Sequence, residues 1–268
     1  MRARPRAQSA RRRVEPAPIL EHDPAPEAII EPAKIYARVR PAEPIEHCVL
    51  CFFHDVNEDV ARHYRLRTIH LGQSEMGNHP VHELEYNARR LVFAHPRIGA
   101  PMSAATLELC IALGCTKFVA CGGAGVLDGS IAVGRVVVPT AAIRDEGTSY
   151  HYLPAGREVA AGARAVAAIE RVLKRNRISY LKGKTWTTDA LFRETRARLR
   201  RRRAEGCLTV EMEAAAFFAV AQFRGVEFGQ ILYGGDDLSG DVWEHRNWNK
   251  HRIRQRLFTL AVEACLLL

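Results

Sequence analysis

The sequence predicts an α/β protein in which a compact core at residues 45–268 follows a proline-rich arm. Short apolar runs alternate with helical stretches along the core, a pattern typical of parallel strands joined by crossover helices. Residues 1–44 hold eight of the thirteen prolines and show little apolar periodicity. We therefore expect this part to be a mobile or surface-hugging arm.

The elements of the core follow from its apolar runs and helical spacings. Apolar runs predict strands at 48–53, 91–94, 117–121, 135–140, 180–185, 209–211 and 228–233. Helical spacing predicts helices at 102–113, 158–175, 212–224 and 253–267, and Gly114 and Gly225 stop two of them. Ligands of such sheets bind beyond the carboxyl ends of the strands. Three segments with glycines or acids have that position: 122–125, 211–213 and 234–237.

The net charge of +9 is concentrated in two arginine clusters, at residues 2–13 and at 196–203 on a further helix. A solvated tail and a solvated helix face explain them, and contact with a phosphate backbone is the alternative. No zinc-finger or RNA-binding motif is present, so we expect no nucleic-acid partner. No apolar stretch reaches the ~18 residues of a membrane span, and no signal peptide is recognisable. We expect a cytoplasmic protein with no membrane partner.

The seven cysteines are scattered through apolar runs. This odd count predicts reduced, buried thiols in a reducing compartment. Cys48 and Cys51 form a CxxC pattern, but no second pair completes a zinc site. We expect no metal.

The glycine-rich segment 122–125 follows a predicted strand. Clustered glycines let backbone N–H groups approach an anion or a sugar oxygen, although a tight structural turn explains them equally well. The spacing matches neither a Walker loop nor a dinucleotide-binding fingerprint.

Two pairs of acids occupy the other candidate segments. Glu211 and Glu213 precede an apolar helix, where they either cap the helix or accept hydrogen bonds from a vicinal diol such as that of ribose. Asp236 and Asp237 follow two glycines at a strand end. They are candidates for a general acid, with a turn or helix cap as the alternative.

Taken in order, four motifs resemble the nucleoside phosphorylase superfamily. They are Gly-Gly-Ala-Gly at 122–125, Lys-Thr-Trp-Thr-Thr-Asp-Ala-Leu-Phe at 184–192, Val-Glu-Met-Glu-Ala-Ala at 210–215 and the strand that ends in Asp236. The resemblance covers residues ~48 to 268, and the segments 132–139 and 144–154 look most like the uridine phosphorylase branch. It implies a single-domain, three-layer αβα fold of the nucleoside phosphorylase/hydrolase type with a mixed central sheet, and a homo-oligomer.

The resemblance also implies roles for individual residues. Met212 and Glu213 match the ribose contacts, with Glu213 taking both hydroxyls, and Glu211 orients the pocket. Asp236 matches the aspartate that protonates a purine base as it leaves. Three further residues match the segment that flanks the base: Asp189, Leu191 and Phe192.

The phosphate-binding residues of the family are largely replaced. Segment 52–57 lacks the glycine and the arginine usual after the first strand, Ala120 replaces an arginine, and Gly123 replaces a serine or threonine. Arg97, at a position that is usually glycine, is a candidate replacement charge; an exposed loop arginine is the alternative. The phosphate contacts that remain as candidates are Gly122, Gly123 and Arg97.

The resemblance therefore implies a pentosyltransferase of nucleoside salvage. It would cleave the N-glycosidic bond of a small-molecule ribonucleoside, with inorganic phosphate as co-substrate and no other cofactor. The lost phosphate residues keep two alternatives open: a nucleosidase that uses water, and a catalytically weak relative that binds a nucleoside or nucleotide.

Overall fold

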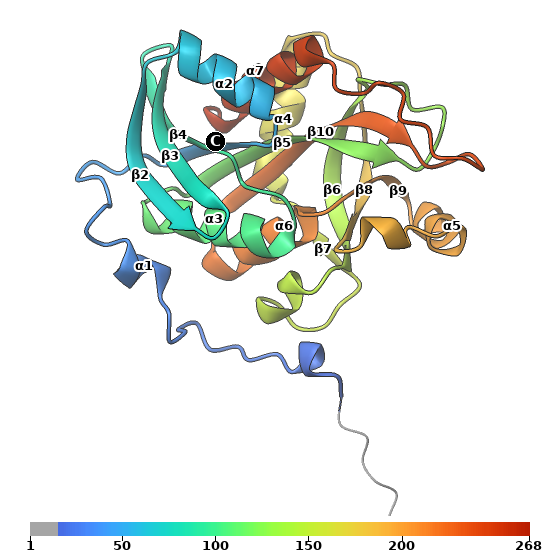
Figure 1. The fold of residues 1–268 in the computed structure, drawn as a ribbon, viewed down its shortest axis with the longest axis horizontal. Coiled ribbons are helices and arrows are strands. Elements are labelled where there is room, and N and C mark those ends of the chain that lie inside the picture. Colours follow the sequence, from blue (N-terminus) through green and yellow to red (C-terminus); the bar gives the residue numbers. More distant parts are fainter. Residues whose placement is uncertain (1–15) are drawn as a thin grey trace, which may run out of the picture.

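A computed structural model describes residues 16–268 and contains a ten-stranded mixed sheet with helices on both faces (Figure 1). The strands are β1 (His47–Cys51), β2 (Leu66–Ser74), β3 (Gly77–Tyr86), β4 (Arg89–Ala94), β5 (Lys117–Val126), β6 (Val136–Asp145), β7 (Glu158–Ala160), β8 (Tyr180–Thr188), β9 (Cys207–Glu211) and β10 (Glu227–Asp237). The helices are α1 (Pro32–Ile35), α2 (His54–His63), α3 (Ala100–Ala112), α4 (Ala163–Arg175), α5 (Arg196–Ala204), α6 (Ala214–Arg224) and α7 (His251–Cys265), with short 3₁₀ turns η1 (Pro18–Leu20), η2 (Thr148–His151) and η3 (Leu191–Arg193).

Five strands of the sheet form a closed ring. β10 pairs with β5 in parallel and with β6 in antiparallel orientation, and β6 pairs with β8 and β8 with β9 in parallel. β9 then returns to β5 in antiparallel orientation. From β5 the sheet continues outward through β1, β4, β3 and β2. The mixed central sheet implied by the resemblance is confirmed.

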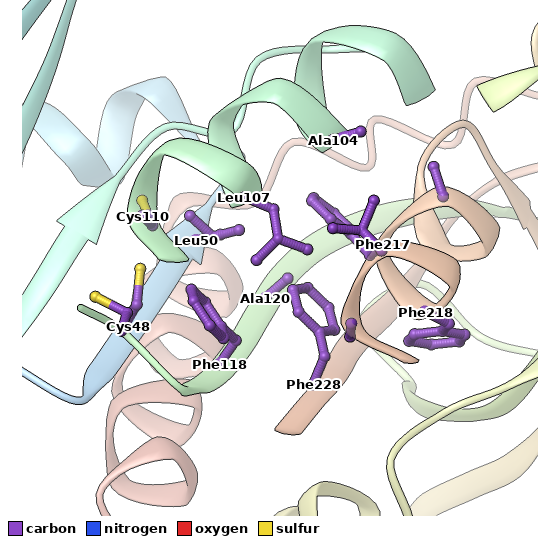
Figure 2. Close-up of a cluster of buried hydrophobic side chains, with 14 of the residues drawn as sticks. Cys48, Leu50, Ala104, Leu107, Cys110, Phe118, Ala120, Phe217, Phe218 and Phe228 are labelled. Atoms are coloured by element: carbon purple, nitrogen blue, oxygen red, sulfur yellow. The ribbon is translucent and has the colours of Figure 1, made fainter. Parts of the chain in front are cut away.

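Two apolar cores hold the helices on the sheet. On one face, Leu50 of β1 and Phe118 of β5 join Leu107 of α3 and Phe217 of α6 (Figure 2). On the other face, side chains of α2, α4 and α7 pack on the alternate residues of the same strands. Burying one large aliphatic or aromatic side chain contributes about 1.5–3 kcal/mol, so both helical layers are strongly attached.

The cysteines behave as the sequence predicts. All seven are buried and free. Cys48 lies in the core under α3 and α6, whereas Cys51 lies in the core on the opposite face. The CxxC pattern therefore does not present two sulfurs to one site.

Two parts of the element prediction are wrong or incomplete. The helix expected at 158–175 begins only at Ala163, because Glu158–Ala160 hydrogen-bonds to the edge of β6 as strand β7. The sequence predicts no element for 54–86, where the structure has α2 and the β2–β3 hairpin. Most side chains of β2 are exposed or only half-buried, so the strand carries little apolar alternation.

The glycines expected to form turns lie inside strands instead. β5 runs through residues 122–125 beside β10, and β10 runs through Gly234 and Gly235 with an irregular register before Asp237. Close packing explains these glycines: a Cβ at Gly234 would lie only 2.9 Å from Val126. At these positions the glycines make room for neighbouring side chains and do not form a turn.

Residues 16–44 run along the outside of the core (Figure 1). η1 and α1 bury no residue, although α1 lies against α3 and Tyr36 packs edge-on against the His70 ring. The arginines at residues 2–13 lie outside the described residues. Within residues 16–268, no helix is both long and apolar enough to span a bilayer.

The second arginine cluster lies on α5. Four of its six arginines form ion pairs with Asp128, Asp145 or Glu205. Much of this positive charge is therefore neutralised locally, in keeping with a solvated helix face.

Candidate active site

Glu211 ends β9, and its carboxylate holds the start of α6. Its Oε2 accepts hydrogen bonds from the N–H groups of Glu213 at 2.8 Å and of Ala214 at 2.6 Å, and its Oε1 accepts one from Thr187 Oγ1 at 2.7 Å. The first N–H groups of a helix have no partner within the helix. Glu211 therefore has the geometry of the capping alternative.

Glu213 lies at the N-terminal boundary of α6 with its side chain buried beside that of Glu211. Its Oε1 accepts a hydrogen bond from the N–H of Gly99 at 2.6 Å, and its Oε2 accepts one from Met212 at 3.3 Å. A carboxylate offers about four acceptor positions. Glu213 therefore keeps about half of its acceptor capacity for a ligand, and the half-buried Met212 lies next to it.

Burial also shifts the proton affinity of this pair. It raises the pKa of Glu213 to about 8 and that of Glu211 to about 7, and the negative charge of Glu211 adds to the rise at Glu213. Glu146, a third buried carboxyl, has one oxygen bonded to the N–H of Ser149 and one without a partner among the described residues. Three carboxyls thus gather in a weakly solvated part of the site.

Asp236 and Asp237 end β10 and have different partners. Asp237 accepts a hydrogen bond from the N–H of Ser239 at 2.7 Å and pairs with Arg246 at 3.4 Å. Asp237 therefore has the geometry of the turn-cap alternative, with an arginine as a second partner. Asp236 accepts one hydrogen bond, at 2.7 Å, from the indole N–H of Trp243.

Glu194 adds a second carboxyl near Asp236. It directly follows η3 and is half-buried. Burial raises the pKa of Glu194 to about 7, and the negative charge of Asp236 contributes to this rise. This end of the site therefore holds a proton near neutral pH.

Aromatic rings cover the two glycines expected to bind phosphate. A Cβ at Gly122 would lie 3.1 Å from the ring of Phe52, and one at Gly123 would lie 2.7 Å from the ring of Trp248. Ala120 is fully buried in the core beneath α3 and α6 (Figure 2). The side-chain positions of Gly122 and Gly123 thus face aromatic residues of the two opposite cores.

Arg97 is half-buried and does not join these glycines. Its guanidinium Nε donates to Thr106 Oγ1 of α3 at 3.3 Å, and its backbone N–H donates to His95 Nδ1 at 2.9 Å. The same loop continues to Gly99, which binds Glu213. Arg97 is thus half-buried, unlike the exposed loop arginine of the alternative, because its side chain turns back onto α3.

The residues expected to flank the base lie near η3. Asp189 Oδ2 accepts a hydrogen bond from the N–H of Gly147 at 2.8 Å, which links two loops at the strand ends. Leu191 is 48% exposed and Phe192 is 93% exposed. The ring of Phe192 therefore contacts little of this chain.

The profile of a known protein family matches most of this chain. The profile described as "Phosphorylase superfamily" matches residues 46–266, which include every candidate site residue. The chain belongs to the phosphorylase superfamily. The three-layer fold with a mixed sheet, expected from the resemblance, agrees with this membership.

Individual members of the superfamily are similar over part or most of the chain. The guanosine phosphorylase of Halorubrum lacusprofundi is 29% identical over 146 residues, which cover 54% of this chain and 61% of that protein. The chain thus matches less than two thirds of that relative's length. The structures of a Vibrio fischeri uridine phosphorylase and a Bacteroides thetaiotaomicron AMP nucleosidase each align with a TM-score of 0.70 at 20% identity. The first alignment covers 84% of this chain and 93% of that structure, and the second covers 88% and 96%.

Four residues near the candidate site are not predicted from the sequence: Glu146, Glu194, Trp243 and Trp248. Glu146 follows β6 directly, so the rule that favours acids after strands would have found it. The other three lie in irregular segments that only the folded chain brings to the site. No local pattern identifies them.

Proposed function

We propose that this member of the phosphorylase superfamily cleaves the N-glycosidic bond of a ribonucleoside and releases the free base. The buried carboxyl of Glu213 carries the proposal. It is held by two backbone N–H groups and keeps acceptor capacity for a ligand. A vicinal diol supplies two O–H donors that match this capacity, with Met212 against the sugar.

The same carboxylate would assist the chemical step. Glycosidic cleavage passes through an oxocarbenium-like sugar, which carries positive charge. Once it has lost its proton, which its pKa of about 8 requires, Glu213 is a negative group fixed in a weakly solvated site, and such a group stabilises positive charge more strongly than water does. Glu211, with its acceptor positions used by α6 and Thr187, would orient Glu213 rather than touch the sugar.

The leaving base needs a proton, and Asp236 is the proposed acid. Its carboxyl lies at the end of β10 with a single hydrogen-bond partner, Trp243. Glu194, which carries a proton near neutral pH, lies close enough for Asp236 to affect its pKa. These two carboxyls would share the proton that the base takes up.

The acceptor of the ribosyl group is inorganic phosphate or water. Phosphate is the co-substrate that the resemblance implies. Two observations favour water: Phe52 and Trp248 cover the glycines of the expected phosphate site, and Ala120 lies in the core. We therefore propose hydrolysis, with phosphorolysis as the second candidate, and neither reaction needs another cofactor.

The test is base release from inosine, adenosine, guanosine and uridine, measured by chromatography with and without inorganic phosphate. Hydrolysis predicts release of free base in phosphate-free buffer. Release only in the presence of phosphate, with ribose 1-phosphate as the second product, would establish phosphorolysis instead. If no base is released while nucleosides raise the melting temperature, the chain is a binding relative.

We also propose that the protein works as a homo-oligomer in the cytoplasm. The exposed Leu191 and Phe192 lie beside the base end of the site, where a second subunit would cover them. Light scattering of the purified protein tests the assembly, and a monomer at micromolar concentration would contradict it.

A further inference from the structure

A cavity of about 450 Å³ lies between α2 and the strands β3 and β4. Its principal polar lining consists of His54 and Asn57 of α2, His79 and His82 of β3, and His95 and Arg97 after β4. Glu58 is the one acidic lining residue, and it pairs with His54 at 3.4 Å. Arg97 supplies the positive charge of the cavity, whereas burial lowers the pKa values of His79, His82 and His95. Apart from Arg97, which the sequence makes a candidate phosphate contact, the reaction proposed above uses none of these residues.

Several of these donors have unused capacity. The guanidinium of Arg97 bonds to Thr106 through Nε, and its two Nη groups have no hydrogen-bond partner in the described part of the chain. His79 and His82 each bond a neighbouring hydroxyl through one ring nitrogen, which leaves the other nitrogen free. Asn57 adds no free donor, because its Nδ2 donates to the carbonyl of Cys51 at 3.1 Å and its buried Oδ1, which has no partner in the described chain, is an acceptor. The cavity therefore offers polar groups that the fold itself does not satisfy.

The backbone conformation of Arg97 also favours a ligand-binding role for this residue. Its φ of +67° lies in the left-handed region, where glycine is favoured and a long side chain is disfavoured. A residue kept in such a conformation needs compensation from its surroundings or from function. Only an arginine or a lysine supplies a positive charge at this position, and arginine also matches the oxygens of a phosphate group in pairs.

We propose that this cavity binds a phosphate group, and that the phosphate is the 5′-monoester of a nucleotide substrate. The assignment rests on the proposed function, in which the base lies at Asp236 and the 2′ and 3′ hydroxyls lie at Glu213. The 5′ carbon is then the remaining substituent of the sugar. Gly99, which binds Glu213, is two residues from Arg97, a span of at most about 7 Å.

The spacing of the strands agrees with this orientation. β4, β1, β5 and β10 are successive neighbours in the sheet. Three steps of about 4.8 Å separate β4 from β10, or about 14 Å in all. The cavity after β4 and the acid at the end of β10 thus lie at opposite ends of a site on the scale of a nucleotide.

The first experiment compares AMP with adenosine and UMP with uridine as substrates of the wild-type protein and of Arg97→Ala, Arg97→Lys and Arg200→Ala. Arg200 is an exposed arginine of α5 without an ion pair in the described chain, and it serves as the matched control. We expect the wild-type protein to prefer the monophosphates in kcat/KM. Arg97→Ala should reduce this preference about 10- to 100-fold, the loss typical of a charge-assisted hydrogen bond. Arg97→Lys should retain part of the preference, and Arg200→Ala all of it.

A second experiment is independent of turnover. Calorimetry measures the binding of ribose 5-phosphate, which has no base to release, to the wild-type protein, to Arg97→Ala and to the double variant His79→Ala/His82→Ala. We expect binding to weaken in both variants. If no nucleoside or nucleotide is cleaved but this binding depends on Arg97, the proposed function fails and the phosphate site stands.

Three results would overturn the inference. The first is equal kcat/KM for nucleotide and nucleoside in the wild-type protein. The second is equal binding of ribose 5-phosphate to the wild-type protein and Arg97→Ala. The third is a requirement for inorganic phosphate that Arg97→Ala removes while nucleotides are not preferred, which would make the cavity a site for free phosphate.

Discussion

The two acidic pairs of the site, Glu211 with Glu213 and Asp236 with Asp237, share one division of roles in two different environments. In each pair one carboxylate is used by the fold: Glu211 caps α6, and Asp237 holds the turn after β10 and Arg246. The other carboxylate keeps acceptor or donor capacity. The glutamates are buried, whereas the aspartates are half-buried.

The comparison shows that neighbouring acids cannot be ranked by residue type. The two acids of a pair differ in how many acceptor positions of their carboxylate oxygens are already hydrogen-bonded to the backbone. The burial of the carboxyl then decides what its free acceptor positions can do. A buried carboxyl suits hydroxyl binding and charge stabilisation, and a half-buried one is accessible to a leaving base.

The strongest test of the aspartate pair is the exchange of each residue for asparagine. Asp236→Asn should lower kcat/KM for purine nucleosides by about 10²–10⁴-fold, because a general acid contributes about that much. Asp237→Asn should instead lower the free energy of unfolding by about 1–3 kcal/mol through its lost charge-assisted contacts. Kinetics and melting curves of both variants check this. A dead Asp237→Asn beside an active Asp236→Asn would reverse the assignment.

The glutamate pair should show a smaller effect on the rate. Glu213→Gln should lower kcat/KM for ribonucleosides tenfold or more, because the amide is a weaker partner for the two hydroxyls and carries no charge. Glu211→Gln should have a clearly smaller effect, since its oxygens face α6 and Thr187. Steady-state kinetics on ribonucleosides and 2′-deoxynucleosides provide the measurement. If the parent enzyme cleaves both classes equally, Glu213 does not bind the diol.

The buried pair should also make stability depend on pH. The folded state holds the proton of Glu213 up to a pKa of about 8, above the ordinary value of 4.5, so it binds more protons than the unfolded chain between these limits. Stability should therefore fall as the pH rises from about 4.5 to about 8. Glu213→Gln should flatten part of this slope and gain stability relative to the wild type at pH 8. Urea unfolding at pH 5, 6.5 and 8 tests this, and parallel curves would refute it.

The smallest expected effect concerns the single partner of Asp236. Trp243→Phe removes the indole N–H but keeps an aromatic ring. One hydrogen bond contributes about 0.5–1.5 kcal/mol, so we expect the variant to lower kcat/KM for purine nucleosides about 2- to 10-fold. Tyr64→Phe, at an exposed tyrosine that follows α2 and lies outside the candidate site, is the control. A loss as large as that of Asp236→Asn would make Trp243 part of the acid itself.

Much of the fold follows from local pattern. The buried strands and the helices α3, α6 and α7 have strong apolar runs, and the free cysteines follow from their positions in those runs. For each pair of acids, the sequence indicates two alternatives, a cap of the backbone or a role in binding or catalysis. Only the observed hydrogen bonds of Glu211 and Asp237 show which acids the fold uses, because such contacts depend on the path of the backbone.

The glycine segments show why the remainder could not be predicted. A run such as 122–125 fits a turn, an anion cradle and a crowded strand equally well, because glycine permits all three. The choice depends on Phe52 and Trp248, which lie about 70 and 125 residues away along the chain. Glu194 reached the site in the same way, through the packing of η3 near the end of β10.

The position of β10 has a consequence for biosynthesis. This strand is the last along the chain, yet it fills the place between β5 and β6. Until residues 227–237 leave the ribosome, β5 lacks its partner along most of its length, and β6 lacks it at Val136 and Val137. Such edges recruit other chains. We therefore expect the newborn protein to need shielding by a chaperone until its final strand is released.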